Sequence, residues 1–180
     1  MNHFSGMKKY AIGVDVGGSH VSAAAVDIRG GKIIAGSLVS HPLNNHAPHD
    51  QIIEKWGQAI VHSMSIAGWN NVSGIGLAMP GPFDYVNGIS LLSGETRKYE
   101  NTYGQNISAS LRNFLQLPEE FPVRFVNDAA AFAIGEAWVG RASGTKRSLS
   151  LTLGTGLGSG FIDRGVPVFG GEQVPANGFV

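Results

Sequence analysis

The sequence predicts an α/β fold in which helices flank a mixed β-sheet. Three observations lead to this class. Short apolar runs separated by glycine turns begin the chain, which is typical of an antiparallel meander. Further on, apolar runs alternate with segments of helical spacing, as in α/β proteins. The 26 glycines among 180 residues lie in clusters at the ends of apolar runs, which indicates tight turns rather than a low-complexity tract.

The predicted elements follow from the spacing of the apolar residues. Five strands are expected in the first part of the chain, at residues 10–16, 21–27, 32–39, 72–79 and 123–126. Three helices are expected at residues 50–68, 105–117 and 127–139, the first with Asp50 as N-cap and Gly68 at its end. Residues 85–102 predict an extended loop or a small hairpin. Further short strands are expected at residues 148–153, 158–163 and 166–169.

Composition excludes several classes of function. Thirteen basic residues balance thirteen acidic ones, so the chain lacks the basic footprint that binding to nucleic acid or to an anionic membrane requires. The absence of cysteine excludes disulfides, thiolate zinc sites and cysteine nucleophiles. Residues 1–10 have no apolar core like that of a signal peptide, and no apolar run reaches membrane-spanning length. These features predict a cytoplasmic protein.

The first candidate site is the stretch Asp15-Val16-Gly17-Gly18-Ser19. Glycines at a turn expose backbone amides to an approaching phosphate, and the serine hydroxyl adds a donor. A carboxylate would repel the phosphate unless a cation such as Mg²⁺ lay between them. The alternative is a β-hairpin built from good turn-forming residues, and the stretch taken alone favours that explanation.

The second candidate is the stretch from Leu153 to Gly160, LGTGLGSG. It matches neither a P-loop nor a dinucleotide-binding fingerprint. Glycine at every second residue would place four glycines on one face of a hairpin, where a ligand could lie against bare backbone. Tight-turn geometry, or packing against another backbone, explains the pattern equally well.

The third candidate is the Asn127-Asp128 pair between a strand and a helix. At the carboxyl edge of a sheet, Asp128 could accept a proton from a substrate hydroxyl while Asn127 holds the substrate by hydrogen bonds. The simpler explanation is N-capping of the helix, for which Asn and Asp are well suited. Taken alone, this pair favours the cap.

The order of these motifs is more specific than any one of them. A DxGG(S/T) hairpin, a Pro-Gly-Pro turn, an Asn-Asp pair and a GTGxGxG hairpin follow one another between about Lys9 and Glu172. This order resembles the N-terminal lobe of the ROK family of sugar kinases and repressors, which shares the actin and hexokinase type of ATPase fold. The resemblance implies a ribonuclease H-like lobe with a five-stranded sheet in residues 1–140. Residues 141–180 would then begin a second lobe that is truncated.

The resemblance also implies two phosphate motifs. Asp15 would lie near Mg²⁺ and be joined to it through water, and the ATP phosphates would lie near the turn that follows it, at Gly17, Gly18 and Ser19. The second phosphate motif would consist of Gly154, Thr155 and Gly156. The cofactors implied are therefore ATP and Mg²⁺, with no zinc motif in this chain.

The remaining residues that match the family motifs concern the sugar. Asn127 and Asp128 match the sugar-binding pair, with Asp128 as the catalytic base, and Pro80 and Gly81 would border the sugar pocket. Glu172 would keep a sugar contact, although the histidine that follows it in family kinases has no counterpart here. The activity implied is transfer of the ATP γ-phosphoryl group to a hydroxyl of a hexose or an N-acetylhexosamine.

Two expectations qualify this activity. Without the rest of a second lobe to complete the cleft, the chain is expected to bind nucleotide poorly and to react slowly or not at all. The alternatives are a non-catalytic sugar sensor and a fragment of a transcriptional regulator, although about nine residues before the first strand leave no room for a helix-turn-helix. The expected partners are a sugar and a nucleotide, without nucleic acid or membrane, and a homodimer is usual in the family.

Overall fold

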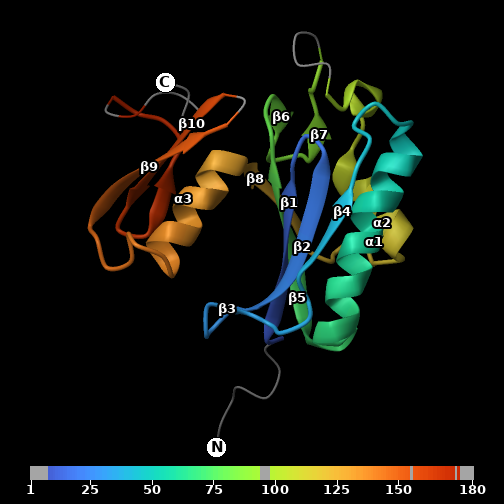
Figure 1. Cartoon of the computed structure of the whole chain (residues 1–180), viewed down its shortest axis with the longest axis horizontal. Coiled ribbons are helices and arrows are strands. Elements are labelled where there is room, and N and C mark those ends of the chain that lie inside the picture. Colours follow the sequence, from blue (N-terminus) through green and yellow to red (C-terminus); the bar gives the residue numbers. More distant parts are fainter. Residues whose placement is uncertain (1–7, 94–97, 155, 173, 175–180) are drawn as a thin grey trace, which may run out of the picture. The chain divides into compact units, whose positions relative to one another are not determined.

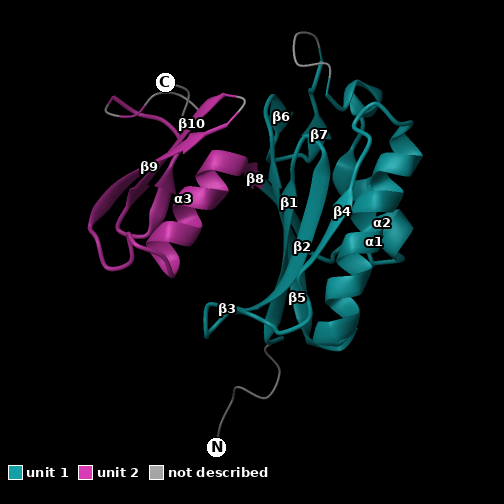
Figure 2. Ribbon diagram, in the orientation of Figure 1, with its two compact units in different colours: residues 1–125 teal, residues 126–180 magenta. Residues whose placement is uncertain are grey.

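The computed structural model describes residues 8–93, 98–154, 156–172 and 174 (Figure 1). The chain forms two compact units, residues 1–125 and residues 126–180 (Figure 2). Each unit is described by itself. The predicted division into lobes after residue 140 concerns the whole protein and stays a prediction.

The first unit is built around a six-stranded mixed sheet with the order β3-β2-β1-β5-β8, in which β4 also pairs with β2. The strands are β1 (Tyr10–Val16), β2 (His20–Asp27), β3 (Lys32–Ile33), β4 (Val39–Pro42), β5 (Val72–Met79) and β8 (Val123–Asn127). Strand β1 runs antiparallel to β2 and parallel to β5. The predicted α/β class with a mixed sheet is therefore confirmed.

One predicted strand is divided in two. The run expected at residues 32–39 forms β3 and β4, separated by a turn in which Gly36 has φ of +79°. Ser37 in this segment is buried, and its hydroxyl accepts a hydrogen bond from the Ala25 amide at 3.0 Å. Because β3 and β4 pair with different parts of β2, the sheet has six strands instead of five.

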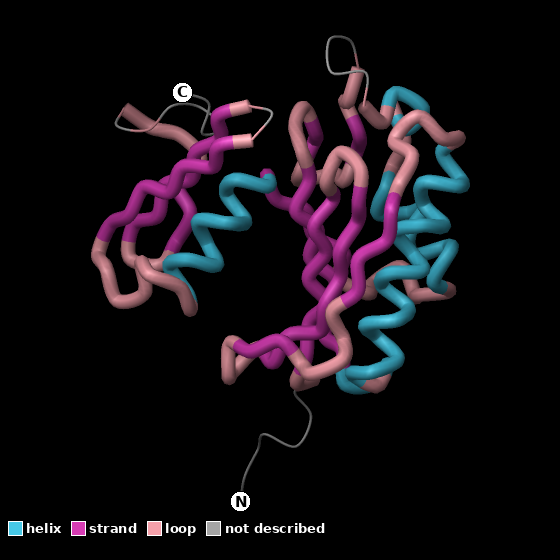
Figure 3. Tube along the Cα trace, in the orientation of Figure 1, coloured by secondary structure: helices cyan, strands magenta, loops and turns pink. Residues whose placement is uncertain are grey.

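Two helices, α1 (His49–Ala67) and α2 (Ile107–Leu115), cover one face of this sheet (Figure 3). Buried residues of β1 alternate with exposed ones, so that Ile12, Val14 and Val16 belong to the core under the helices. Helix α1 begins after Pro48, and Asp50 lies in its first turn instead of serving as the cap. Gly68 ends α1 with φ of +77°, a conformation that glycine adopts readily.

A small hairpin lies between β5 and α2, where the sequence predicts either an extended loop or a small hairpin. It consists of β6 (Phe83–Asp84) and β7 (Ile89–Ser90). The described residues of this unit also contain the 3₁₀ helices η1 (Trp69–Asn71) and η3 (Glu100–Thr102). No helix among the described residues is both long and apolar enough to cross a bilayer.

The second unit consists of helix α3 (Asp128–Trp138) and a three-stranded sheet with the order β11-β10-β9. The strands are β9 (Arg147–Leu153), β10 (Leu157–Asp163) and β11 (Val166–Val168), and both neighbouring pairs are antiparallel. All four elements lie within about one residue of their predicted positions. Helix α3 packs on this sheet, and Ala129 and Ala133 are buried there.

Candidate functional site

Asp15 lies near the end of β1, on the face of the sheet opposite to α1 and α2. Its neighbours Val14 and Val16 are buried, whereas Asp15 itself is exposed. In the parallel pairing of β1 with β5, Asp15 is opposite Ala78, two residues before Pro80. The structure therefore brings Asp15 and the Pro80-Gly81 turn to one edge of the sheet, outside the carboxyl ends of parallel strands, where α/β proteins usually bind ligands.

The turn that follows Asp15 has all three of its carbonyl groups bound by the protein. The Tyr99 hydroxyl donates a hydrogen bond to the Gly17 carbonyl, and the Asn45 side-chain amide donates one to the Gly18 carbonyl. The Leu43 backbone amide donates to the Ser19 carbonyl at 2.8 Å. The orientation of the turn is thus fixed by groups from three separate positions in the sequence.

The hydrogen bonds to these carbonyls determine the direction in which the amides of the turn point. In a trans peptide the carbonyl of one residue and the amide of the next lie on opposite sides of the bond. When the Gly17 and Gly18 carbonyls face the protein, the Gly18 and Ser19 amides face away from it. Neither amide donates a hydrogen bond to another of the described residues. Successive outward amides of this kind form an anion-binding concavity.

Tyr99 is a site residue that the sequence analysis did not find. Its ring is fully buried against Trp56, with ring centroids 5.5 Å apart, and its backbone has φ of 59°. Burial raises the pKa of the Tyr99 hydroxyl well above its usual value, and the nearby Asp15 carboxylate raises it further. The hydroxyl therefore remains protonated at neutral pH and remains a donor to Gly17.

The Pro80-Gly81 turn is held from the following hairpin. The Tyr85 hydroxyl donates a hydrogen bond to the Met79 carbonyl at 3.2 Å, immediately before the turn. The peptide bond between Gly81 and Pro82 is cis. Pro80 and Gly81 are half-buried, so that part of each remains accessible at this edge of the sheet.

A magnesium site at Asp15 is compatible with the side chains present. The described residues contain no group of three or more His, Cys, Asp or Glu side chains that could hold a metal ion. Mg²⁺ usually keeps several waters and binds through one or two carboxylates together with substrate phosphates. An exposed carboxylate beside an anion-binding turn suits that mode of binding.

In the second unit, Asn127 is the N-cap of helix α3. Its side-chain oxygen accepts hydrogen bonds from the Ala129 and Ala130 amides at 3.0 and 3.2 Å. Asp128 is exposed at the start of the helix, and its Oδ1 accepts a hydrogen bond from the Ala129 amide at 2.8 Å. The capping explanation for Asn127 is therefore confirmed, while the Asp128 carboxylate remains accessible to a substrate.

The glycine-rich hairpin between β9 and β10 divides into two parts. A β-carbon at Gly160 would lie 2.4 Å from the Ala133 Cβ and 2.9 Å from the Ala129 carbonyl oxygen, so this glycine lets β10 approach α3. At Gly154 and Gly156 a β-carbon would meet nothing within 4 Å. Packing against neighbouring residues explains Gly158 and Gly160. Of the four glycines, only Gly154 and Gly156 leave room for a ligand. Thr155 lies outside the described residues.

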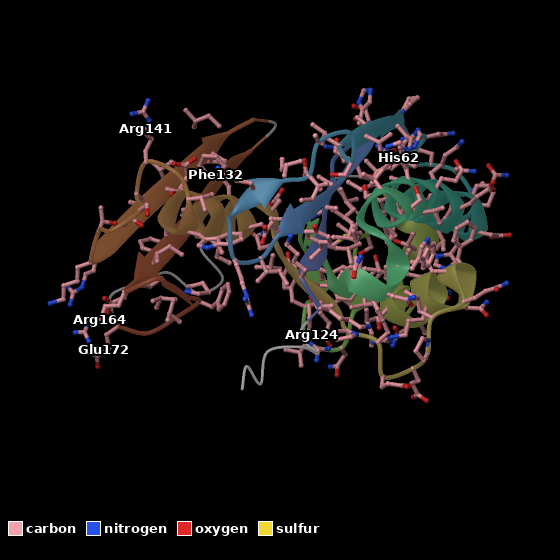
Figure 4. All side chains as sticks on the ribbon, turned by 90° about the horizontal axis from the view of Figure 1, so that it is seen from below. His62, Arg124, Phe132, Arg141, Arg164 and Glu172 are labelled. Carbon is pink, nitrogen blue, oxygen red and sulfur yellow. The ribbon has the colours of Figure 1, made fainter. Side chains whose placement is uncertain are left out.

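Glu172 is the last of the predicted site residues. It is exposed, and Figure 4 shows its side chain pointing outward from the second unit. The described site residues that the sequence predicts thus fall into two groups, one in each unit. Asp15, Gly17, Gly18, Ser19, Pro80 and Gly81 form the first group, and Asn127, Asp128, Gly154, Gly156 and Glu172 lie in the second unit.

An α/β lobe with a turn of outward-facing amides after its first strand is the class of protein that this geometry defines. The model of the ROK family matches residues 11–177 of the chain. The chain belongs to the ROK family.

Similar proteins agree with this assignment. The chain is 29% identical to a β-glucoside kinase of Listeria innocua over 151 residues, which cover 83% of this chain and 49% of that kinase. It is also 29% identical to a xylose repressor of Bacillus spizizenii, over 91% of this chain and 41% of the repressor. The chain thus spans about half the length of the curated relatives it matches.

Solved structures show the same fold. The ROK hexokinase of Thermus thermophilus superimposes with a TM-score of 0.74 at 28% identity, over 89% of this chain and 49% of the hexokinase. A ROK family glucokinase of Streptomyces griseus, solved in complex with glucose and AMPPNP, superimposes with a TM-score of 0.70 at 27% identity. That match covers 93% of this chain and 49% of the glucokinase.

Proposed function

We propose that this chain is part of an ATP-dependent sugar kinase, in which it supplies the first phosphate turn and the catalytic carboxylate. The observation that carries this proposal is the turn at Gly17 to Ser19, whose carbonyls are all bound by the protein while the Gly18 and Ser19 amides face away. Such a turn is suited to a phosphate. Membership of a family that includes sugar kinases identifies a nucleotide and a sugar as the ligands to test.

In the proposed reaction, Asp128 accepts the proton of the attacking sugar hydroxyl. The hydroxyl oxygen forms a bond to the γ-phosphorus of ATP, and the bond from that phosphorus to the bridging oxygen of ADP breaks. The sugar phosphate and ADP leave, and the proton on Asp128 returns to solvent. The Asp128 carboxylate is exposed at the N-terminus of α3, where a substrate hydroxyl can reach it.

The other residues position the reactants. Outward amides of Gly18 and Ser19 would bind phosphate oxygens, and the Gly154-Gly156 turn would face phosphate with bare backbone. Mg²⁺ would be held near Asp15 through water, where it neutralises phosphate charge. Asn127, Pro80, Gly81 and Glu172 would line the sugar site. A hexose is the first substrate to test, because a similar glucokinase was solved with glucose bound.

A sugar-sensing regulator is the second candidate. It is favoured by the similarity to xylose repressors, which belong to the same set of relatives as the kinases. A sensor would bind sugar without consuming ATP. The two candidates therefore differ in a single observable, the sugar-dependent formation of ADP.

The test is an assay of ADP formation with Mg-ATP and a panel of hexoses, N-acetylhexosamines and β-glucosides. It is run on this chain and on any longer form of the protein, with sugar binding measured in parallel by calorimetry. The kinase proposal predicts ADP formation that depends on one or a few sugars. Sugar binding without any ADP formation, in the longest form, would favour the sensor instead.

A further inference from the structure

The phosphate turn has a cationic neighbour that none of the sequence motifs includes. A β-carbon on residue 18 would lie 3.1 Å from the Lys98 Nζ, 3.3 Å from its Cε and 3.6 Å from its Cδ. The end of the Lys98 side chain therefore runs along the backbone of Gly18, in the space that the missing side chain leaves open. Among the described residues, the three atoms nearest to that position all belong to Lys98.

The position of Lys98 is fixed by the residue that follows it. The Tyr99 amide donates a hydrogen bond to the Asn45 carbonyl at 2.9 Å, and the Tyr99 carbonyl accepts one from the Thr102 hydroxyl at 2.7 Å. The Tyr99 hydroxyl is bound to Gly17 in the same turn. Hydrogen bonds fix both the backbone and the side chain of Tyr99, so the α-carbon of the neighbouring Lys98 is kept near the turn. The Lys98 side chain can therefore reach Gly18.

The charges at the turn give this ammonium group a role. The only carboxylate among the residues of the DVGGS stretch is Asp15, which would repel a phosphate that approached the outward amides. The amides carry partial positive charges only, whereas a lysine ammonium carries a full charge and can donate three hydrogen bonds. A lysine beside a glycine-rich turn is also a chemically suitable partner for phosphate, as a point charge.

We infer that Lys98, whose side chain lies across Gly18, binds a phosphate oxygen of the nucleotide. This inference rests on the proposed function for the identity of the ligand. It adds a residue to the phosphate site that comes from the segment before η3, outside both glycine motifs. The turn thereby gains a full positive charge that can follow the phosphate oxygens during transfer.

The experiment compares four forms of the chain: wild type, Lys98→Met, Lys98→Arg and Lys55→Met. Lys55 is an exposed lysine on α1 and serves as the matched control for loss of one positive charge. Calorimetry measures binding of inorganic tripolyphosphate and of AMPPNP with Mg²⁺. Circular dichroism and thermal melting check that each variant is folded, which is expected because Lys98 is only half-buried.

Lys98→Met is expected to bind both phosphate compounds about tenfold or more weakly, because a hydrogen bond to a charged group is lost. Lys98→Arg is expected to retain most of the affinity, and Lys55→Met is expected to bind like wild type. Equal affinities of wild type and Lys98→Met would overturn the inference. So would an equal loss in Lys55→Met, or a wild-type chain that binds neither compound.

The same variants separate this inference from the proposed function. Sugar-dependent ADP formation that Lys98→Met leaves unchanged, together with unchanged tripolyphosphate binding, would contradict the role of Lys98 alone. Loss of tripolyphosphate binding in Lys98→Met, in a protein that forms no ADP with any sugar, would contradict the kinase proposal and support the phosphate contact.

Discussion

The hydroxyl group of Tyr99 donates a hydrogen bond to the backbone carbonyl of Gly17, across 82 residues of sequence. A buried tyrosine from the segment after the Pro-Gly-Pro turn therefore determines the orientation of a turn near the N-terminus. The Asn45 side chain does the same for the next carbonyl. The proposed phosphate binding by this turn would thus depend on residues that lie outside the glycine motif.

Tyr99→Phe tests the importance of that bond. The change removes the donor and leaves the Gly17 carbonyl without its partner, which is expected to lower the free energy of unfolding by about 1–3 kcal/mol. It is also expected to weaken tripolyphosphate binding, because the outward amides lose their fixed orientation. Urea unfolding and calorimetry measure the two effects. Tyr103→Phe, at an exposed position, is the control and is expected to change neither.

The raised pKa of Tyr99 predicts a pH dependence of stability. Because burial and Asp15 raise the pKa in the folded state, the unfolded chain loses this proton first, near pH 10. Stability is therefore complete below about pH 10 and falls above it, by at most about 1.4 kcal/mol per pH unit for this one group. The free energy of unfolding of wild type and of Tyr99→Phe, measured between pH 8 and pH 11, isolates the contribution of the Tyr99 hydroxyl. A stability difference that stays constant over this range would contradict the prediction.

Asn127 is predicted to have two separable roles. Asn127→Ala removes the cap of α3 and is expected to destabilise the protein by about 1 kcal/mol and to weaken sugar binding. Asn127→Asp keeps a capping oxygen, so stability should be retained while the amide donor to the sugar is lost. Asn106→Ala removes the cap of α2 as a control and should leave the affinity for glucose unchanged. If Asn127→Asp bound glucose like wild type, Asn127 would be a cap only.

The two parts of the glycine-rich hairpin are predicted to respond differently to alanine. Gly160→Ala places a methyl group against Ala133 and Ala129, and is expected to cost about 1–3 kcal/mol of stability through overpacking. Gly156→Ala meets no neighbour within 4 Å and is expected to leave stability nearly unchanged while it weakens phosphate binding. Urea unfolding distinguishes them, and equal destabilisation by both changes would contradict this division of the hairpin.

Apolar periodicity and turn residues were sufficient to predict most of the fold. Helix α1 ends at Gly68 as expected, because the required backbone conformation is one that glycine adopts. The break between β3 and β4 could not be predicted from periodicity, since it depends on Ser37 bonding to Ala25 twelve residues away. The sequence predicts that α1 begins with Asp50 as its cap, whereas the helix begins at His49 with Pro48 at the N-cap position.

The candidate site was predicted in part. Motif order gave the turn at Gly17 and the Asn127-Asp128 pair, because these residues combine local conformation with chemical function in a short stretch. Tyr99, Asn45 and Lys98 were missed because each lies against a residue that is far away in sequence. The one signal in the sequence was Tyr99 next to Lys98 in an otherwise polar segment. Such a pair does not by itself indicate any particular chemistry.

The proposed role of Asp128 is that of the base in a phosphoryl transfer from ATP to a sugar. Its most direct test is the rate of glucose-dependent ADP formation in wild type and Asp128→Asn, in the longest form of the protein that shows activity, with glucose binding measured beside it. Asp128→Asn is expected to remain folded and to bind glucose, but to form ADP at least about 100-fold more slowly because a general base is lost. ADP formation at the wild-type rate in Asp128→Asn would contradict it.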